Sequence, residues 1–94
     1  MNTDFLNQKD RVLSPGMVSD EHFRRLIDIS TVRSDKVINA LQEYFVNGTA
    51  RNVICERYQV NSGYLSIKIR EIQSLSRRIL DIYPYFCQPN IYAP

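Results

Sequence analysis

The sequence predicts one small all-α domain of about four helices that contains a helix-turn-helix. At 94 residues the chain has room for one domain, and a hydrophobic content of 44% supplies a core of modest size. Residues Thr49–Leu80 have the pattern of a short helix, a tight turn and a longer cationic helix. Two capped segments with apolar residues at helical spacing precede them, and an irregular segment is expected at each end of the chain.

The first sixteen residues are predicted to form a flexible N-terminal arm. Met1–Gly16 is polar, shows no sustained periodicity and ends in the turn-forming group Ser14-Pro15-Gly16. Its basic residues Lys9 and Arg11 are balanced by two nearby aspartates, so a solvated arm explains the segment better than a DNA contact does. The helix-turn-helix domain itself is expected to span residues 17–83.

Two helices are predicted in the first half of this domain. Ser19 is the expected N-cap of the first helix, which has acidic residues in its first turn and should end near Ile29. The pair Ser34-Asp35 starts the second helix in the same way, and Asn47-Gly48 ends it. The expected core residues are Phe23, Leu26 and Ile27 in the first helix and Val37, Ile38, Leu41, Tyr44 and Phe45 in the second.

A short third helix is predicted to start at Thr49 as its N-cap. Three of its residues, Val53, Ile54 and Tyr58, are available for the core. Cys55 stands where helix-turn-helix motifs need a small residue against their second helix, which predicts a structural role for it.

The turn after this helix is predicted at Gln59 and Val60, and Asn61 or Ser62 is expected to cap the fourth helix. Many motifs of this kind carry Gly at the position of Gln59, because the turn residue often has a positive φ. Gln at this position either costs conformational energy or indicates a different turn. Gly63 allows a neighbouring backbone to come close to the start of the fourth helix.

The fourth helix is predicted to be long and to end before Pro84. At about 1.5 Å per residue it exceeds roughly 25 Å, so its second half has room to pack on the first helix or on a partner subunit. Residues 84–94 contain three prolines and are predicted to form an irregular tail, whose apolar side chains dock on the domain or on another protomer. The expected inner face consists of Leu65, Ile69, Ile72, Ile79 and Tyr83, widened by Leu75 and Leu80.

The polar face of the fourth helix is the candidate DNA-binding surface. Ser62, Ser66, Arg70, Gln73 and Arg77 recur at a spacing that keeps them on one side of a helix. Hydroxyl and amide groups can meet base edges or phosphates, and arginines neutralise phosphate charge or enter a narrow A/T minor groove. This half of the chain, from residue 51 on, has six basic and three acidic residues, whereas residues 1–50 have six and seven.

Further DNA contacts are expected at the start of the fourth helix and on the third. Asn61–Gly63 present backbone N–H groups and the positive end of the helix dipole, which suit a phosphate. Arg51 and Arg57 are expected to clamp phosphates, and the alternative for each is an ordinary surface charge. Tyr64 either lies along a sugar-phosphate strand or fills the core. An ordinary solvated face is the alternative for the whole surface, but its small residues favour close approach of a nucleic acid.

The sequence lacks the patterns of enzymes, metal sites and membrane proteins. It has no glycine-rich phosphate loop, no paired carboxylates and no nucleophile with a base, and His22 has no second histidine to complete a zinc site. No apolar run reaches the roughly 18 residues of a membrane span. The first residues also lack the basic-then-apolar order that is typical of a signal peptide. Cys55 and Cys87 fit free thiols in a reducing compartment. We therefore expect an intracellular protein that is not an enzyme and has no cofactor, metal or small-molecule substrate.

The predicted helix-turn-helix also carries a family resemblance. The run RNVICERYQVNSGYLS, residues 51–66, closely resembles the PapB-type regulators of fimbrial adhesin biosynthesis in enteric bacteria. The resemblance covers about residues 15–66 and departs from the family pattern at Ile67-Lys68. Its upstream matches are His22-Phe23, Leu26-Ile27, Ile29-Ser30, Ser34-Asp35 and Val37-Ile38.

This resemblance implies a small all-helical transcription regulator of a fimbrial operon, located in the bacterial cytoplasm and involved in phase-variable pilus expression. It implies binding to A/T-rich repeats of double-stranded DNA as a homo-oligomer. It also places Arg51 at a family position linked to DNA binding or assembly, and Cys55 at the position of the family's cysteine.

Two hypotheses for the function follow from these patterns. In the first, the protein binds DNA through Arg51, Ser62, Ser66, Arg70 and Arg77 and acts as a multimer, since one small module offers a limited contact area. In the second, it is a protein-interaction module of helix-turn-helix shape that binds another regulator through its apolar tail and fourth helix. The salt dependence of binding distinguishes the two hypotheses. Binding to DNA through several phosphates weakens steeply as the salt concentration rises, whereas binding through an apolar interface does not.

Overall fold

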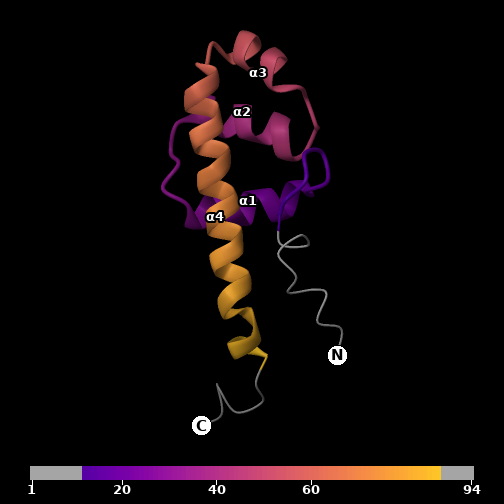
Figure 1. The fold of residues 1–94 in the computed structure, drawn as a ribbon, viewed down its shortest axis with the longest axis vertical. Coiled ribbons are helices and arrows are strands. Elements are labelled where there is room, and N and C mark those ends of the chain that lie inside the picture. Colours follow the sequence, from indigo (N-terminus) through magenta and orange to yellow (C-terminus); the bar gives the residue numbers. More distant parts are fainter. Residues whose placement is uncertain (1–11, 88–94) are drawn as a thin grey trace.

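The computed structural model describes residues 12–87, which form four α-helices (Figure 1). Helix α1 spans Asp20–Ile29 and helix α2 spans Asp35–Phe45. Their caps are as predicted, because the Ser19 hydroxyl accepts a hydrogen bond from the N–H of His22 and the Ser34 hydroxyl accepts one from Val37. The predictions for Lys9, Arg11 and the last seven residues lie outside the described part of the chain.

Helix α3 (Arg51–Tyr58) and helix α4 (Ser62–Phe86) form the helix-turn-helix. The predicted cap of α3 is wrong. Ala50 occupies the N-cap position and forms no side-chain hydrogen bond, while the Thr49 hydroxyl donates to the Glu43 carboxylate at 2.6 Å. A bond to a charged acceptor is stronger than one to a neutral acceptor, which explains why Thr49 turns away from the helix it precedes.

Asn61 is the N-cap of α4, and the turn before it has the positive φ that is common in this motif. Gln59 has φ 55°, and the N–H groups of Gln59 and Val60 both donate to the Cys55 carbonyl oxygen. Two further bonds support Gln59 in this conformation: its amide donates to the Glu56 carbonyl at 2.9 Å, and its own carbonyl accepts from the Lys36 ammonium at 3.3 Å. These bonds offset the cost of a residue with a Cβ at positive φ.

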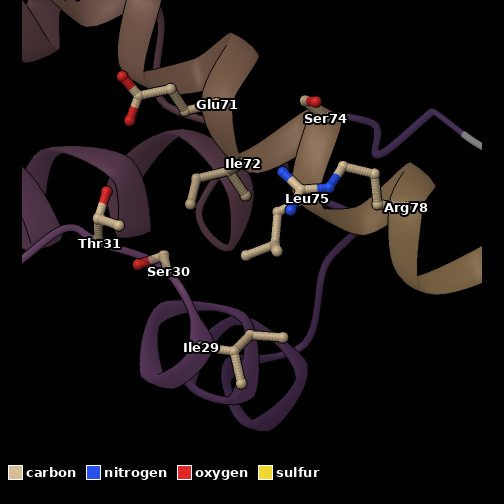
Figure 2. A pocket seen from close by; sticks show the side chains of 8 residues that line it. All are labelled: Ile29, Ser30, Thr31, Glu71, Ile72, Ser74, Leu75 and Arg78. Atoms are coloured by element: carbon tan, nitrogen blue, oxygen red, sulfur yellow. The ribbon is translucent and has the colours of Figure 1, made fainter.

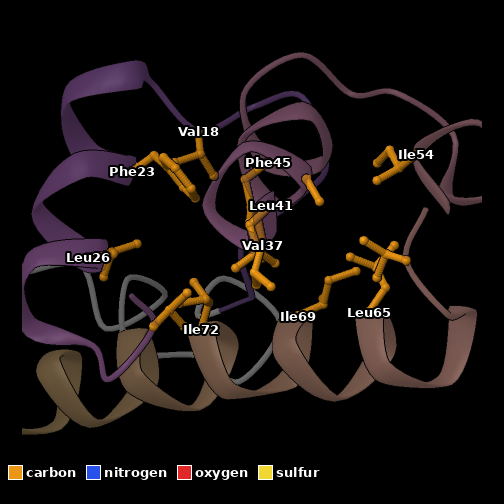
Figure 3. Packing of buried hydrophobic residues seen from close by; sticks show 13 residues of the cluster. Val18, Phe23, Leu26, Val37, Leu41, Phe45, Ile54, Leu65, Ile69 and Ile72 are labelled. Carbon is orange, nitrogen blue, oxygen red and sulfur yellow. The ribbon is translucent and has the colours of Figure 1, made fainter. Parts of the chain in front are cut away.

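The four helices share one hydrophobic core, with α4 lying across α1 and α2, and α3 covering one end (Figures 1 and 3). Most of the predicted core residues are buried. The buried apolar residues are Val18, Phe23, Leu26, Val32, Val37, Ala40, Leu41, Phe45, Ile54, Val60, Leu65, Ile69 and Ile72, and Ile27, Ile38, Tyr44, Tyr58 and Ile79 pack against them. Leu75 and Leu80 are half-buried.

Two predicted core residues are instead exposed. Val53 is 39% exposed, since α3 has about two turns and meets the core along the edge centred on Ile54. Tyr83 is 50% exposed and belongs to the last turns of α4, and the end of this helix extends past α1 (Figure 1).

The end of α4 also differs from the prediction. The helix continues through Pro84 to Phe86, so residues 84–86 are helical and not the start of an irregular tail. Proline fixes φ near the helical value, so the backbone can continue as a helix, although the missing N–H removes one hydrogen bond to the preceding turn. Here the helix ends within a turn, where the Cys87 N–H donates to the Pro84 carbonyl at 3.2 Å.

The segment before α1 is attached to the domain, so the predicted flexible arm does not extend to residue 16. The side chain of Gln73, on α4, bonds both backbone groups of Leu13: its oxygen accepts from the N–H at 2.8 Å and its nitrogen donates to the carbonyl at 2.7 Å. Three residues on, the Gly16 N–H donates to the Tyr44 carbonyl at 3.1 Å.

Candidate nucleic-acid interface

The start of α4 presents its small residues to solvent. The Asn61 side-chain oxygen accepts hydrogen bonds from the N–H groups of Gly63 (2.8 Å) and Tyr64 (3.2 Å), so this oxygen has a structural role in capping. Ser62 and Gly63 are exposed. A Cβ added at Gly63 would meet only the Asn61 oxygen, at 3.2 Å, and its outer side is open. Apart from its own helix and its chain neighbours, no backbone among residues 12–87 lies within 4 Å of this position, so the close backbone approach expected at Gly63 is absent from the described residues.

Arg51 joins the two helices of the motif. It lies in the first turn of α3, and its guanidinium donates to the Ser66 hydroxyl of α4 at 2.8 Å. The same guanidinium lies 5.3 Å from the centre of the Tyr44 ring, within range of a cation–π contact. These two contacts orient Arg51 while it stays exposed. The structure thus brings together Arg51 and Ser66, which the sequence analysis placed on separate helices.

The remaining predicted residues of α4 lie along its exposed surface. Tyr64 is 45% exposed with the Lys68 ammonium 5.4 Å from its ring centre, which excludes the alternative that it fills the core. Arg70 and Arg77 are exposed, and no ion pair joins Arg70 to another residue between 12 and 87. Gln73 does not belong to this surface, because both of its polar atoms bond Leu13.

Arg57 is held by a carboxylate that the sequence analysis did not single out. Its guanidinium donates to Glu43 at 2.9 Å, and the Arg57 side chain stays 52% exposed. Glu43 has only 16% of its side chain exposed and also accepts from the hydroxyls of Thr49 (2.6 Å) and Tyr58 (3.0 Å) and from the Asn47 amide (3.3 Å). Four donors therefore converge on one carboxylate.

These donors hold the pKa of Glu43 at about 2, below its ordinary value of 4.5. The hydrogen bonds from Thr49, Asn47 and Tyr58 are the largest causes, and the Arg57 charge adds to them against the opposing effect of burial. One sequence signal points to this site: Glu43 lies in the last turn of α2, where the helix dipole disfavours a negative charge. A glutamate at such a position indicates donors that come from elsewhere in the fold.

Cys55 is half-buried against the core, as its predicted structural role requires, and both Cys55 and Cys87 are free thiols. The residues that the structure describes include no group of three or more His, Cys, Asp or Glu placed to hold a metal ion. Within the same residues, no helix combines the length and the apolar character needed to cross a membrane.

A separate shallow pocket lies between the end of α1 and the middle of α4 (Figure 2). Ile29, Ser30 and Thr31 line one side of it, and Glu71, Ile72, Ser74, Leu75 and Arg78 line the other. None of the predicted DNA contacts takes part in it.

Comparison with known proteins identifies the family. Residues 1–86 match the PapB family, described as adhesin biosynthesis transcription regulatory proteins. The chain belongs to this family. The relatives of this regulator include the regulatory protein FanB of Escherichia coli, which is 50% identical over 82 residues, 87% of this chain and 83% of FanB. The major pilus subunit operon regulatory protein PapB of Escherichia coli is 40% identical over 85 residues, 90% of this chain and 82% of PapB.

The crystal structure of Escherichia coli FocB has the same fold, with a TM-score of 0.75 and 36% sequence identity over 90% of this chain and 99% of FocB. These similarities confirm the predicted all-α fold and the PapB-type resemblance. The chain is a transcription regulatory protein of the fimbrial adhesin class and not an enzyme.

Proposed function

We propose that this regulator binds double-stranded A/T-rich DNA of a fimbrial operon through α3 and the polar side of α4 from Ser62 to Arg77. It acts in the bacterial cytoplasm, where the chromosome lies, and binds repeated sites as a homo-oligomer in the phase-variable expression of pili. The observation that carries the proposal is the link between Arg51 and Ser66, which joins the two helices of the motif into one exposed polar surface beside Ser62 and Gly63.

The charge of Arg51 is available to phosphates. Several other cations of the domain already bind carboxylates: Arg24 pairs with Asp20, Arg25 with Glu21 and Lys68 with Glu71. Arg51, in contrast, bonds a neutral hydroxyl and an aromatic ring, which leave its charge uncompensated. Cations without nearby acids contribute most to the release of counterions from DNA.

Each contact residue has a role that its chemistry suits. Arg51, Arg70 and Arg77 neutralise phosphates or enter a narrow minor groove, and Arg57 offers a phosphate the N–H groups that Glu43 does not use. The backbone N–H groups of Asn61, Ser62 and Gly63 and the hydroxyls of Ser62 and Ser66 meet the sugar-phosphate strand or base edges. Tyr64 lies along the strand. The preference for A/T-rich repeats rests on the family resemblance.

Assembly into oligomers is supported by the second half of α4. Ile82, Tyr83, Tyr85 and Phe86 are each about half exposed or more, on the part of the helix that extends beyond the other helices (Figure 1). Large apolar side chains gathered in this way are typical of protein interfaces. The same surface supports the second hypothesis, in which the domain binds a different regulator.

Fluorescence anisotropy with a labelled A/T-rich duplex from the upstream region of the operon tests the proposal. Affinity should fall steeply as salt rises, and Arg70→Ala and Arg77→Ala should each weaken binding and lower the salt slope by about 1. Arg25→Ala is the matched control, because that arginine lies on α1 and is paired with Glu21. Unchanged affinity in both α4 variants would remove the proposed contacts.

Footprinting on the same upstream region reports the sites, their spacing and cooperativity. Cooperative protection of regularly spaced A/T-rich sites is the expected result. Sedimentation that shows a strict monomer at high concentration, both free and on DNA, would contradict assembly.

A further inference from the structure

Helix α3 has few interactions of its own that fix its position. It is eight residues long, its N-cap Ala50 forms no side-chain hydrogen bond, and Ile54 is its one fully buried residue. Helices of this length are marginal in isolation and depend on tertiary contacts. The position of α3 therefore depends on its neighbours.

Glu43 supplies these contacts at both ends of α3. Thr49, two residues before the helix begins, bonds one carboxylate oxygen, and Arg57 and Tyr58, in its last turn, bond the other. The carboxylate itself belongs to the last turn of α2, whose inner side is buried in the core. One side chain thus connects a firmly packed helix to the start and the end of a weakly packed one.

We propose that Glu43 is the positioning residue of the DNA-binding surface: it fixes α3 against α2 and so holds Arg51 beside Ser66 of α4. This inference rests on the proposed function, in which that surface binds DNA. Glu43 does not touch the DNA. It acts through the placement of Arg51, whose bond to Ser66 requires the first turn of α3 to stay within hydrogen-bond distance of α4.

The chemistry of the site requires a carboxylate. Its two oxygens accept from four donors, whereas the amide of glutamine has one acceptor oxygen and an NH₂ group that would face donors. Near DNA, a negative charge by itself weakens binding. A positioning role therefore predicts that removing this charge weakens DNA binding, which is the opposite of what simple electrostatics predicts.

The test compares Glu43→Gln with Glu56→Gln by anisotropy on the A/T-rich duplex, well below the unfolding temperature of each variant. Glu56 is an exposed residue of α3, the helix that Glu43 is proposed to position, and its substitution makes the same change of charge. Glu56→Gln should bind as the natural chain does or slightly more tightly. Glu43→Gln should bind about five-fold more weakly, as expected for the loss of one charge-assisted contact. Equal affinities for the two variants would overturn the proposal.

Coupling to Arg51 separates a positioning role from a general loss of stability. Arg51→Ala should weaken DNA binding less in the Glu43→Gln background than in the natural chain, because Arg51 is already displaced there. Additive effects of the two substitutions on affinity would contradict the proposal. Tyr58→Phe and Thr49→Val each remove a single donor and keep the carboxylate. Each should therefore weaken DNA binding less than Glu43→Gln does, with less risk to folding.

Amide hydrogen exchange tests the same inference without DNA. The Ile54 N–H bonds the Ala50 carbonyl at 3.1 Å in the first turn of α3, and it should exchange faster in Glu43→Gln than in Glu56→Gln. The Phe23 N–H, in α1, should exchange at the same rate in both variants. Failure of DNA binding by the natural chain would refute the proposed function, whereas unchanged exchange at Ile54 would refute the positioning role.

Discussion

Protonation of Glu43 should remove a measurable part of the stability of the fold. Its pKa is about 2 in the folded chain and 4.5 ordinarily. A carboxyl whose pKa is lowered by folding stabilises the fold above its ordinary pKa, and this contribution is lost as the pH falls toward the lowered value. At ~1.4 kcal/mol per pKa unit, the difference corresponds to about 3 kcal/mol at neutral pH, of which about 2 kcal/mol is lost by pH 3.

Urea unfolding followed by circular dichroism, at intervals from pH 7 to pH 3, measures this contribution. The difference in unfolding free energy between the natural chain and Glu43→Gln should shrink by about 2 kcal/mol across this range, because the other carboxyl groups cancel in the comparison. For Glu56→Gln the difference should stay within about 0.5 kcal/mol, as for most surface changes. Parallel curves for the natural chain and Glu43→Gln would refute the assignment of the low pKa to Glu43.

Substitutions at three further positions test the packing of the fold. Ile72→Ala, at the fully buried centre of α4, should lower the unfolding free energy measured in urea by about 2–5 kcal/mol, against about 1 kcal/mol for Ile72→Val. Gly48→Ala should lower the melting temperature, because Gly48 has φ 73° and a Cβ there would lie 3.2 Å from the Gly16 Cα; an unchanged melting temperature would contradict this geometry. Gln73→Ala should speed hydrogen exchange of the Leu13 amide with little change in DNA affinity. A large loss of affinity would show that Gln73 belongs to the DNA-binding surface.

Sequence alone predicted the start of a helix where the capping side chain and the N–H group that it accepts from lie at most three residues apart. Ser19, Ser34 and Asn61 each accept from an N–H of the turn that follows them, so the local sequence contains both partners. Thr49 has the same residue type as these caps, but its hydroxyl is taken by Glu43, six residues away and in another helix. Capping was therefore predictable except where a tertiary acceptor competes.

Gln73 was misassigned and Glu43 was missed because each has partners far along the chain. Gln73 falls on the polar side of α4 by its spacing, yet it bonds Leu13, sixty residues away. Glu43 receives donors from the loop after α2 and from the last turn of α3, and its bonds to Arg57 and Tyr58 cross 14 and 15 residues, which no helical spacing in the sequence predicts. The candidate surface was predicted in outline from helical spacing, and the network that orients it required the fold.

Backbone NMR during titration with an A/T-rich duplex locates the DNA-binding surface residue by residue. Chemical-shift changes are expected at Arg51, at Ser62–Ser66, at Arg70 and at Arg77, and they should disappear when salt is raised because the contacts are to phosphates. Changes confined to Ile82–Phe86, or changes that persist in high salt, would contradict the assignment of α3 and the polar side of α4 from Ser62 to Arg77 as the DNA-binding surface.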